Sequence, residues 1–303
     1  MYLNGRLLCF VLFILFFVTI HAMAQDKEIQ ENDTISLWDV GGTFALNFSE
    51  SSFSNWNAGG TNSIGLNGIF KPHANIDDTL WTWNNAFDLR FGLVKTQGEK
   101  IRKSDDLFLF NSKLGRKISK HWEFSGLFTF RTQFAPSYRK SDDQLLSTFM
   151  APGYTNLGLG FNYKPNAALS IYLSPLTNRS TYVLNDSLSQ AGEFGITPGN
   201  KVKRQVGFST LMTYKQEVIK NVGINTDLVI FSDYLNKPHN IVVNWDFVLT
   251  LKASKFLSTT FSCALIYDDN VTFEEKDESG NVIKKVPKIQ FKQVLGIGIS
   301  LGF

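Results

Sequence analysis

The chain has 303 residues, 43 % of them hydrophobic, which suffices for one large β domain or two ordinary domains. The net charge is only +3, with 30 basic and 27 acidic residues, so composition gives no basis for nucleic-acid binding. Only two cysteines occur, and Cys9 lies in a predicted leader, which excludes an intramolecular disulfide or a thiolate metal cluster in the mature chain. Cys263 is then alone, and it alternates with apolar residues as a packed or lipid-facing thiol would.

The first 24 residues have the pattern of a secretory signal peptide. Arg6 supplies a positive charge, the apolar run from Leu7 to Ile20 follows, and Ala22-Met23-Ala24 has the small residues of a cleavage site. The run is too short for a comfortable membrane span. We therefore expect cleavage after Ala24, and a short periplasmic tail over the polar residues 25–41.

The segment from Phe291 to Phe303 shows the pattern that the other predicted strands share. Its odd positions are mostly large and apolar, whereas its even positions are small or polar. This period of two is that of a β-strand whose faces meet different surroundings. The same alternation recurs from Gly42 onward and predicts twelve strands, at about 42–50, 61–71, 79–94, 104–118, 121–134, 154–164, 168–175, 202–216, 220–233, 240–253, 257–269 and 287–303.

The connections between these strands alternate between short and long. An up-and-down transmembrane β-barrel with both termini in the periplasm requires this order, with short periplasmic turns, longer outer loops and an even number of strands. A soluble β-sandwich, the alternative, has no reason to separate its loops in this way. We therefore predict an all-β, antiparallel barrel of about twelve strands over residues 42–303, located in the bacterial outer membrane and in contact with its lipid.

Aromatic residues agree with that prediction, because amphipathic rings prefer the headgroup level of a membrane. They fall at the two expected membrane surfaces, with Trp81, Trp122, Tyr163, Tyr214 and Phe303 at the periplasmic ends and Tyr234 and Tyr267 at the outer ends. The final strand is expected to close the barrel near Phe44, Leu46 and Phe48. Ending on Phe303, it resembles the C-terminal strand that outer-membrane barrels present to their assembly machinery, which makes that machinery an expected partner.

Few residues are arranged as in known catalytic or metal sites. His73, His121 and His239 do not share a strand at ligand spacing, and the chain has no H-E-x-x-H, C-x-x-C or G-x-S-x-G motif. We expect no metal and no other cofactor. An enzyme is an alternative, because aspartate pairs near the outer loops could act as acid–base groups at the rim of a lipase or protease. The pairs are Asp105-Asp106, Asp142-Asp143 and Asp268-Asp269.

The residues expected to face the lumen are more informative. Charged side chains of both signs occupy the alternate strand positions that are expected to face the lumen. They therefore either form ion pairs that fill the barrel or line a water channel. These residues are Asp88, Arg90, Glu123, Arg131, Asp227, Asp246 and Lys252. Trp56, in the predicted first outer loop, could anchor that loop on the rim or in the lumen. The pattern favours non-enzymatic passage or binding of small polar solutes, with a purely structural barrel as a further alternative. The binding candidates are Trp56, Asp88, Arg90, Glu123, Arg131 and Asp246.

Several short motifs of the sequence carry a resemblance to a known family. They are Trp38, Gly41-Gly42, Leu46-Asn47-Phe48-Ser49, Ser52–Gly60, Asn62-Ser63, Lys103-Ser104-Asp105-Asp106, Thr132-Gln133-Phe134, Ala151-Pro152, Leu157-Gly158-Leu159-Gly160, Lys164-Pro165-Asn166, Ser174–Thr177, Val243-Asn244-Trp245 and Leu265-Ile266-Tyr267-Asp268-Asp269. Together they resemble the family catalogued as domain of unknown function 3078, found in Bacteroidetes-type Gram-negative bacteria. The resemblance implies an outer-membrane location and supplies no catalytic residue and no ligand. Among the motifs, Ser174-Pro175-Leu176-Thr177 is expected to end the seventh strand, because proline cannot donate a ladder hydrogen bond.

Overall fold

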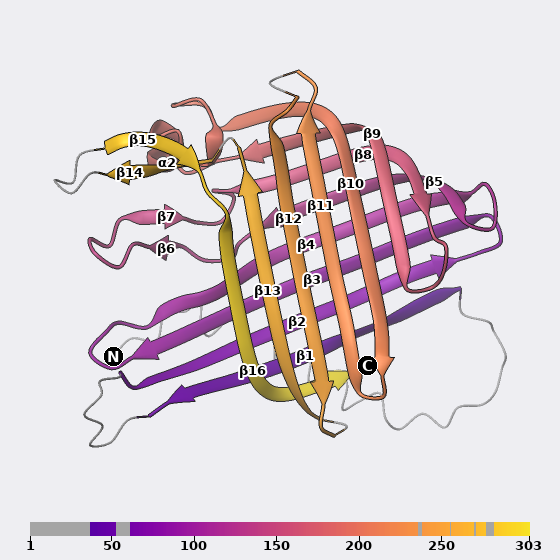
Figure 1. The fold of residues 1–303 in the computed structure, drawn as a ribbon, viewed down its shortest axis with the longest axis horizontal. Coiled ribbons are helices and arrows are strands. Elements are labelled where there is room, and N and C mark those ends of the chain that lie inside the picture. Colours follow the sequence, from indigo (N-terminus) through magenta and orange to yellow (C-terminus); the bar gives the residue numbers. More distant parts are fainter. Residues whose placement is uncertain (1–36, 53–60, 236–237, 255, 270, 277–281) are drawn as a thin grey trace. The chain divides into compact units, whose positions relative to one another are not determined.

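A computed structural model describes residues 37–52, 61–235, 238–254, 256–269, 271–276 and 282–303. Its strands form a closed antiparallel barrel in the order β1-β16-β13-β12-β11-β10-β9-β8-β5-β4-β3-β2 (Figure 1). This confirms the predicted twelve-stranded up-and-down barrel. The predicted leader, most of the predicted tail and Trp56 lie outside the described residues.

Consecutive barrel strands are neighbours in the wall, as the alternating connections require. Short turns join β2 to β3, β4 to β5, β8 to β9, β10 to β11 and β12 to β13, and the longer connections lie at the opposite end. The barrel strands are β1 (Trp38–Ser51), β2 (Ser63–Asp77), β3 (Trp81–Thr96), β4 (Arg102–Lys117), β5 (Trp122–Thr132), β8 (Gly153–Tyr163), β9 (Leu169–Tyr182), β10 (Val202–Ile219), β11 (Val222–Asp233), β12 (Ile241–Lys252), β13 (Leu257–Asp268) and β16 (Gln290–Gly302).

Two strands are longer than their sequence pattern indicates. β1 begins at Trp38, four residues before the expected Gly42, and β2 continues to Asp77 instead of ending near Lys71. β2 passes through Pro72, which has no N–H, and its pairing with β3 skips Lys71 and Pro72. The same register resumes at His73, so the proline interrupts the ladder locally without ending the strand.

The prediction that Pro175 ends the seventh strand is wrong. β9 runs on to Tyr182 and pairs with β10 on both sides of the proline. The register shifts between Ser174 and Thr177, so Pro175 and Leu176 lie in a β-bulge. A bulge leaves residues outside the ladder, which accommodates a residue that has no N–H to donate.

The outside of the barrel is apolar. Large hydrophobic side chains on alternate positions face outward, including Leu46 and Phe48 of β1 and Leu295, Ile297 and Ile299 of β16. A closed sheet with a polar inside and an apolar outside is the arrangement of a transmembrane barrel. Among the described residues, no helix is long and apolar enough to cross a membrane.

Aromatic side chains lie at the ends of the apolar surface, as predicted. Trp81 and Trp122 are exposed at the short-turn end, where Trp122 packs against Tyr163 with ring centroids 4.8 Å apart. Arg116 lies over the Trp81 ring, 5.9 Å from its centroid. Tyr234 is exposed at the opposite end.

The first and last strands close the barrel, at the residues the sequence indicates. Phe44 pairs with Leu301, and Phe48 pairs with Ile297. The seam has only six register pairs, against fourteen between β1 and β2, and is extended by two hydrogen bonds between Gly42 and Phe303. A Cβ on Gly298 would lie 2.0 Å from the Leu46 carbonyl oxygen, so this close approach requires glycine.

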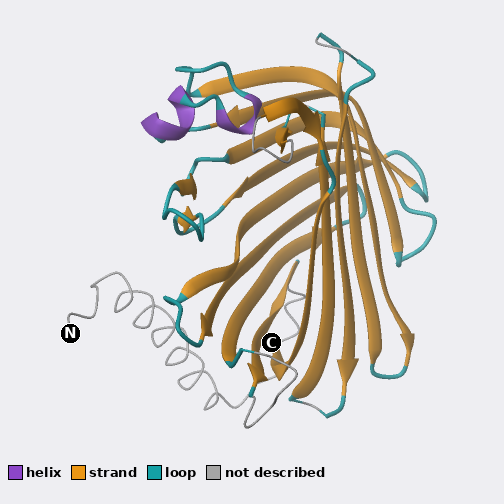
Figure 2. Ribbon diagram, turned by 60° about the vertical axis from the view of Figure 1, so that its left-hand side comes forward, coloured by secondary structure: helices purple, strands orange, loops and turns teal. Residues whose placement is uncertain are grey.

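The longer connections contain structure of their own, visible at one end of the barrel (Figure 2). They include β6 (Ser137–Tyr138) with β7 (Leu145–Ser147), α2 (Asp186–Gln190), η1 (Glu193–Gly195), and β14 (Thr272–Lys276) with β15 (Val282–Pro287). Ala151, Val183, Leu188 and Ile196 bury one another there. This small apolar cluster ties the β5–β8 connection to the β9–β10 connection.

Candidate functional site

The described binding candidates from the sequence lie on the lumen side in separate groups: Asp88 with Arg90, Arg131 with Asp246, and Glu123 in a network of its own. Arg90 lies beside Asp88, its partner in a 2.5 Å ion pair, and Lys71 approaches the same carboxylate at 3.0 Å. Asp88 and Arg90 share the lumen face of β3, since they are two residues apart. Lys71 comes from β2 next to the interruption at Pro72. These residues form a charged cluster on one wall.

Three ion pairs span the lumen between strands that are not neighbours. Arg131 of β5 lies 4.0 Å from Asp246 of β12, and Lys292 of β16 lies 2.5 Å from Asp105 of β4. Opposite charges from distant strands therefore meet in the interior. The paired side chains narrow the lumen.

The third cross-lumen pair lies nearer the long connections. Arg179 of β9 lies 3.3 Å from Asp268 of β13, and both side chains are nearly buried. The guanidinium also lies against two rings, 5.5 Å from the centroid of Tyr154 and 5.4 Å from that of Phe231. Cation–π contacts of this kind hold an arginine in place.

Glu123, the remaining candidate, belongs to a packed polar network. Its carboxylate accepts hydrogen bonds from Asn162 at 3.0 Å and from Lys164 at 2.9 Å. Lys113 and Ser170 in turn donate to the Asn162 side-chain oxygen. We call these five residues the Glu123 network; they fill the β4–β5–β8–β9 side of the lumen, together with the buried Tyr172.

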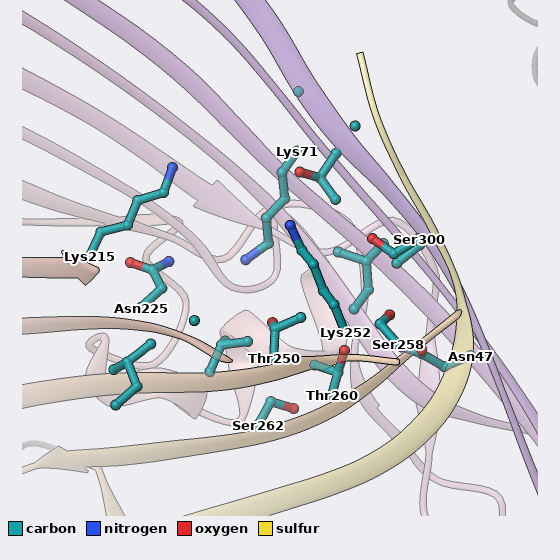
Figure 3. A pocket seen from close by; sticks show the side chains of 18 of the residues that line it. Asn47, Lys71, Lys215, Asn225, Thr250, Lys252, Ser258, Thr260, Ser262 and Ser300 are labelled. Atoms are coloured by element: carbon teal, nitrogen blue, oxygen red, sulfur yellow. The ribbon is translucent and has the colours of Figure 1, made fainter. Parts of the chain in front are cut away.

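The opposite side of the lumen contains a cavity of about 590 Å³. Its wall comes mainly from β1, β2, β11, β12, β13 and β16, and it reaches the short-turn end at Asn221, Ser254 and Phe256. Small hydroxyl and amide residues dominate that wall, and Lys71, Lys215 and Lys252 point into the same space (Figure 3). We call it the vestibule. Arg90 and Asp105 lie at its inner end.

Electrostatics differ between the vestibule and the rest of the lumen. The inner acids are paired, Asp88 with Arg90 and Lys71, and Asp105 with Lys292. Among the described residues, Lys215 and Lys252 have no ion-pair partner. Glu217 lies at the same end of the vestibule as these two lysines, so both ends contain more basic than acidic side chains.

The rim aspartates, the basis of the alternative enzymatic role, each contact a neighbouring group. Asp142 pairs with Arg139 at 3.3 Å, and Asp106 pairs with Lys103 at 2.7 Å. Asp269 accepts a hydrogen bond from the Tyr267 hydroxyl at 2.6 Å. These carboxylates organise the loops to which they belong.

The histidines contact different groups. His121 contacts the Lys164 carbonyl oxygen beside a short turn, and His73 lies 3.7 Å from Asp39. Within the described part of the chain, no three His, Cys, Asp or Glu residues are grouped so that they could hold a metal ion.

Some lumen residues could not be singled out from the sequence. Lys71, Asn47 and Ser258 line the vestibule, yet each is an ordinary polar residue within an alternating strand. Their parity assigns them to the lumen, but the partner across the lumen depends on strand tilt and stagger, which a single strand does not encode.

Similar solved structures include outer-membrane barrels. The COG4313 outer membrane channel from Pseudomonas putida F1 is 11 % identical, with a TM-score of 0.40, and the match covers 92 % of this chain and 100 % of the other. The translocator domain of the autotransporter NalP from Neisseria meningitidis is 7 % identical, with a TM-score of 0.34, and the match covers 100 % of this chain and 98 % of the other. The NanC porin is 7 % identical, with a TM-score of 0.35, over 87 % of this chain and 98 % of the other.

No curated protein matches this sequence. A family model does match, over residues 48–138, which run from Phe48 of β1 to Tyr138 of β6. The matching segment therefore includes β2 to β5, with the Asp88–Arg90 pair and Glu123. Residues 48–138 match the family described as Protein of unknown function (DUF3078), which confirms the resemblance seen in the motifs.

Proposed function

We propose that this protein is a non-enzymatic barrel of the bacterial outer membrane that passes or binds small polar solutes. One observation carries the proposal: the vestibule, about 590 Å³ in volume, is lined by hydroxyl, amide and lysine side chains. Pockets for small molecules commonly have volumes of about 300–1,000 Å³. A barrel with only a structural role would not need an open polar space on one side of its interior.

The orientation follows the general rule for bacterial barrels, in which short turns face the periplasm and longer loops face outward. The vestibule reaches the short-turn end, so it faces the periplasm. The cross-lumen pairs Arg131–Asp246, Lys292–Asp105 and Arg179–Asp268 separate it from the outer side. Solute passage requires these pairs to rearrange, whereas solute binding does not.

Membrane lipid and the barrel assembly machinery are the proposed partners. The apolar row of β16, with Leu295, Ile297 and Ile299 exposed, fits contact with lipid. The exposed Phe303 ends the same strand, where assembly factors would bind. Removing Leu301 to Phe303 should sharply reduce the amount of protein in the outer membrane.

Planar-bilayer recording tests the proposal, together with swelling of liposomes that contain the protein in small polar solutes. The wild type should conduct, and Arg90→Ala and Arg131→Ala should widen the openings because each removes a charged side chain from the inner lumen. Lys140→Ala is the matched control, since Lys140 pairs with Glu99 in the loops. The proposal would be contradicted if the wild type and all three variants showed no conductance and the wild type bound no small solute in calorimetry.

A further inference from the structure

A row of lumen-facing residues crosses the vestibule from strand to strand. The register places Ser258 opposite Gly298, Gly298 opposite Asn47, and Asn47 opposite Asn67. Neighbouring strands are about 4.8 Å apart, so such a row follows the wall in steps of that size. The complete row, from the short-turn end inward, is Lys252, Ser258, Gly298, Asn47, Asn67, Gly92 and Asp105. We call it the polar row.

Three consecutive side chains of the polar row contain buried polar atoms without a hydrogen-bond partner. They are the Ser258 hydroxyl, the Asn47 side-chain oxygen and the Asn67 side-chain oxygen. Ser258 is 2 % exposed and Asn47 is 6 % exposed, and both line the vestibule. Buried polar groups in proteins nearly always have partners, so three in one row require an explanation. A bound solute would supply those partners.

The orientation of Asn67 shows which chemistry that solute must have. Its amide nitrogen donates to the Asp105 carboxylate at 3.1 Å, so its side-chain oxygen is left as an acceptor. Asp105 is itself held by Lys292 at 2.5 Å, which fixes the arrangement. The solute must therefore donate a hydrogen bond to Asn67, which an anion that carries no hydrogen, such as sulfate, cannot do.

The charges around the row disfavour a cationic donor. The vestibule wall contains Lys71, Arg90, Lys215 and Lys252, and its acids are Asp105, paired with Lys292, and Glu217. A neutral donor fits better, and it must also accept hydrogen bonds from Lys252 and from the Ser258 hydroxyl. Hydroxyl groups donate and accept at the same time.

Glycines of β16 accommodate the Asn47 side chain. Gly296 and Gly298 lie between Asn47 and the β13 residues Ser258 and Thr260, so no β16 side chain separates them. A Cβ on Gly296 would lie 2.9 Å from the Asn47 Cβ, and a Cβ on Gly298 would lie 2.6 Å from the Asn47 side-chain oxygen. The glycines therefore allow Asn47 to lie close against β16 at the edge of the vestibule.

We infer that the polar row binds a small polyhydroxylated solute of the saccharide class, through Asn67, Asn47 and Ser258. The inference rests on the proposed function, because it names the class of solute that the vestibule takes. It is nevertheless separable from that function: a barrel can conduct ions without recognising hydroxyl groups.

Calorimetric titration tests the inference. The protein is refolded in lauryldimethylamine oxide, since a sugar-headed detergent would compete, and is titrated with maltose, with glucose and with potassium sulfate. Ser258→Ala and Asn47→Ala should each weaken saccharide binding by about fivefold, the value of one ordinary hydrogen bond. Ser125→Ala is the matched control, because the Ser125 hydroxyl is also buried without a partner but lies on the filled side of the lumen.

The expected result is saccharide binding in wild type and Ser125→Ala, weaker binding in the two row variants, and no competition by sulfate. Ser258→Ala should also keep its thermal midpoint, because an unpartnered hydroxyl makes no bond to lose. Failure of both sugars to bind a correctly folded wild type would overturn the inference, as would equal binding by all variants. Conductance that persists without saccharide binding would leave the proposed function standing.

Discussion

The two sides of the lumen differ in what their polar residues contact. On the β4–β5–β8–β9 side, Glu123, Asn162, Lys113 and their neighbours bond to one another and fill the interior. On the β1–β13–β16 side, the polar residues that line the vestibule are short. Both sides come from strands with the same alternation of apolar and polar positions. Side-chain length and complementary charge, rather than polarity, therefore decide where the barrel is filled and where it is hollow.

The hollow side also contains the seam that closes the barrel. β16 has glycine at positions 296, 298 and 302. Gly298 allows close approach to β1, and Gly302 lines the vestibule. The filled side has more extensive cross-strand bonding, so the two sides should respond differently to substitution.

The largest expected effect on folding comes from a substitution at the seam between β1 and β16. In Gly298→Ala the new Cβ would lie 2.0 Å from the Leu46 carbonyl oxygen, so β1 and β16 must separate. Overpacking and unpaired backbone groups in lipid together cost about 3 kcal/mol or more, enough to prevent most of the protein from folding. The folded fraction is measured by the gel shift between unheated and boiled samples.

Gly223→Ala is the control for that substitution. It also lies in a barrel strand, but a Cβ there has nothing within 4 Å. Normal folding of Gly298→Ala would contradict the view that this seam depends on glycine.

The next largest effect is in the filled side. Glu123→Ala removes the acceptor of Asn162 and Lys164 and leaves buried donors unpaired, at a cost of about 2 kcal/mol in the free energy of unfolding. Urea-induced unfolding in detergent measures the change. Thr260→Ala, on the vestibule wall, is the control and should change the free energy of unfolding little. Equal losses in both variants would remove the distinction between a filled and a hollow side.

A smaller effect on stability is expected at the inner end of the vestibule. Arg90→Ala leaves Asp88 paired with Lys71 at 3.0 Å, so the carboxylate keeps one partner and about 1 kcal/mol is lost. Lys71→Ala, which leaves the shorter Arg90 pair in place, should cost less. Urea unfolding ranks the two variants, and the reverse order would show that Lys71 is the main partner.

The smallest effect is at the rim, which belongs to neither side. Lys100 hydrogen-bonds Asp143 at 2.9 Å and lowers the pKa of that carboxyl below its ordinary value. A lowered pKa stabilises the fold above the ordinary pKa, and that contribution is lost as pH falls through the lowered one. As pH falls below about 4, the thermal midpoint of Asp143→Asn should therefore decrease slightly less than that of the wild type. Asparagine also tolerates the positive φ of 52° at this residue.

Much of the fold could be predicted because a transmembrane barrel repeats one local rule. Alternation in each strand and the order of short and long connections gave the strand number, and the Phe44–Leu301 pairing lies where the apolar rows indicate. Pro175 shows the limit of that rule. Its effect depends on whether β10 can shift register beside it, which is a property of the neighbouring strand.

The candidate site could be predicted only in part. Parity placed Asp88, Arg90, Glu123, Arg131 and Asp246 in the lumen, where ion pairs now join most of them. Parity could not show that Glu123 belongs to a packed network while Asn47 faces a cavity. That difference depends on which strands face each other across the barrel, as the Lys292–Asp105 pair illustrates.

Cysteine labelling tests most directly whether the lumen is hollow on one side and filled on the other. In a Cys263→Ala background, Thr250→Cys lies on the vestibule wall and Ser170→Cys lies in the Glu123 network. Both proteins are refolded and treated with a charged methanethiosulfonate reagent, and the modified fraction is followed by mass spectrometry. We predict rapid modification of the cysteine at position 250 and little at position 170. Equal rates at the two positions would contradict the account.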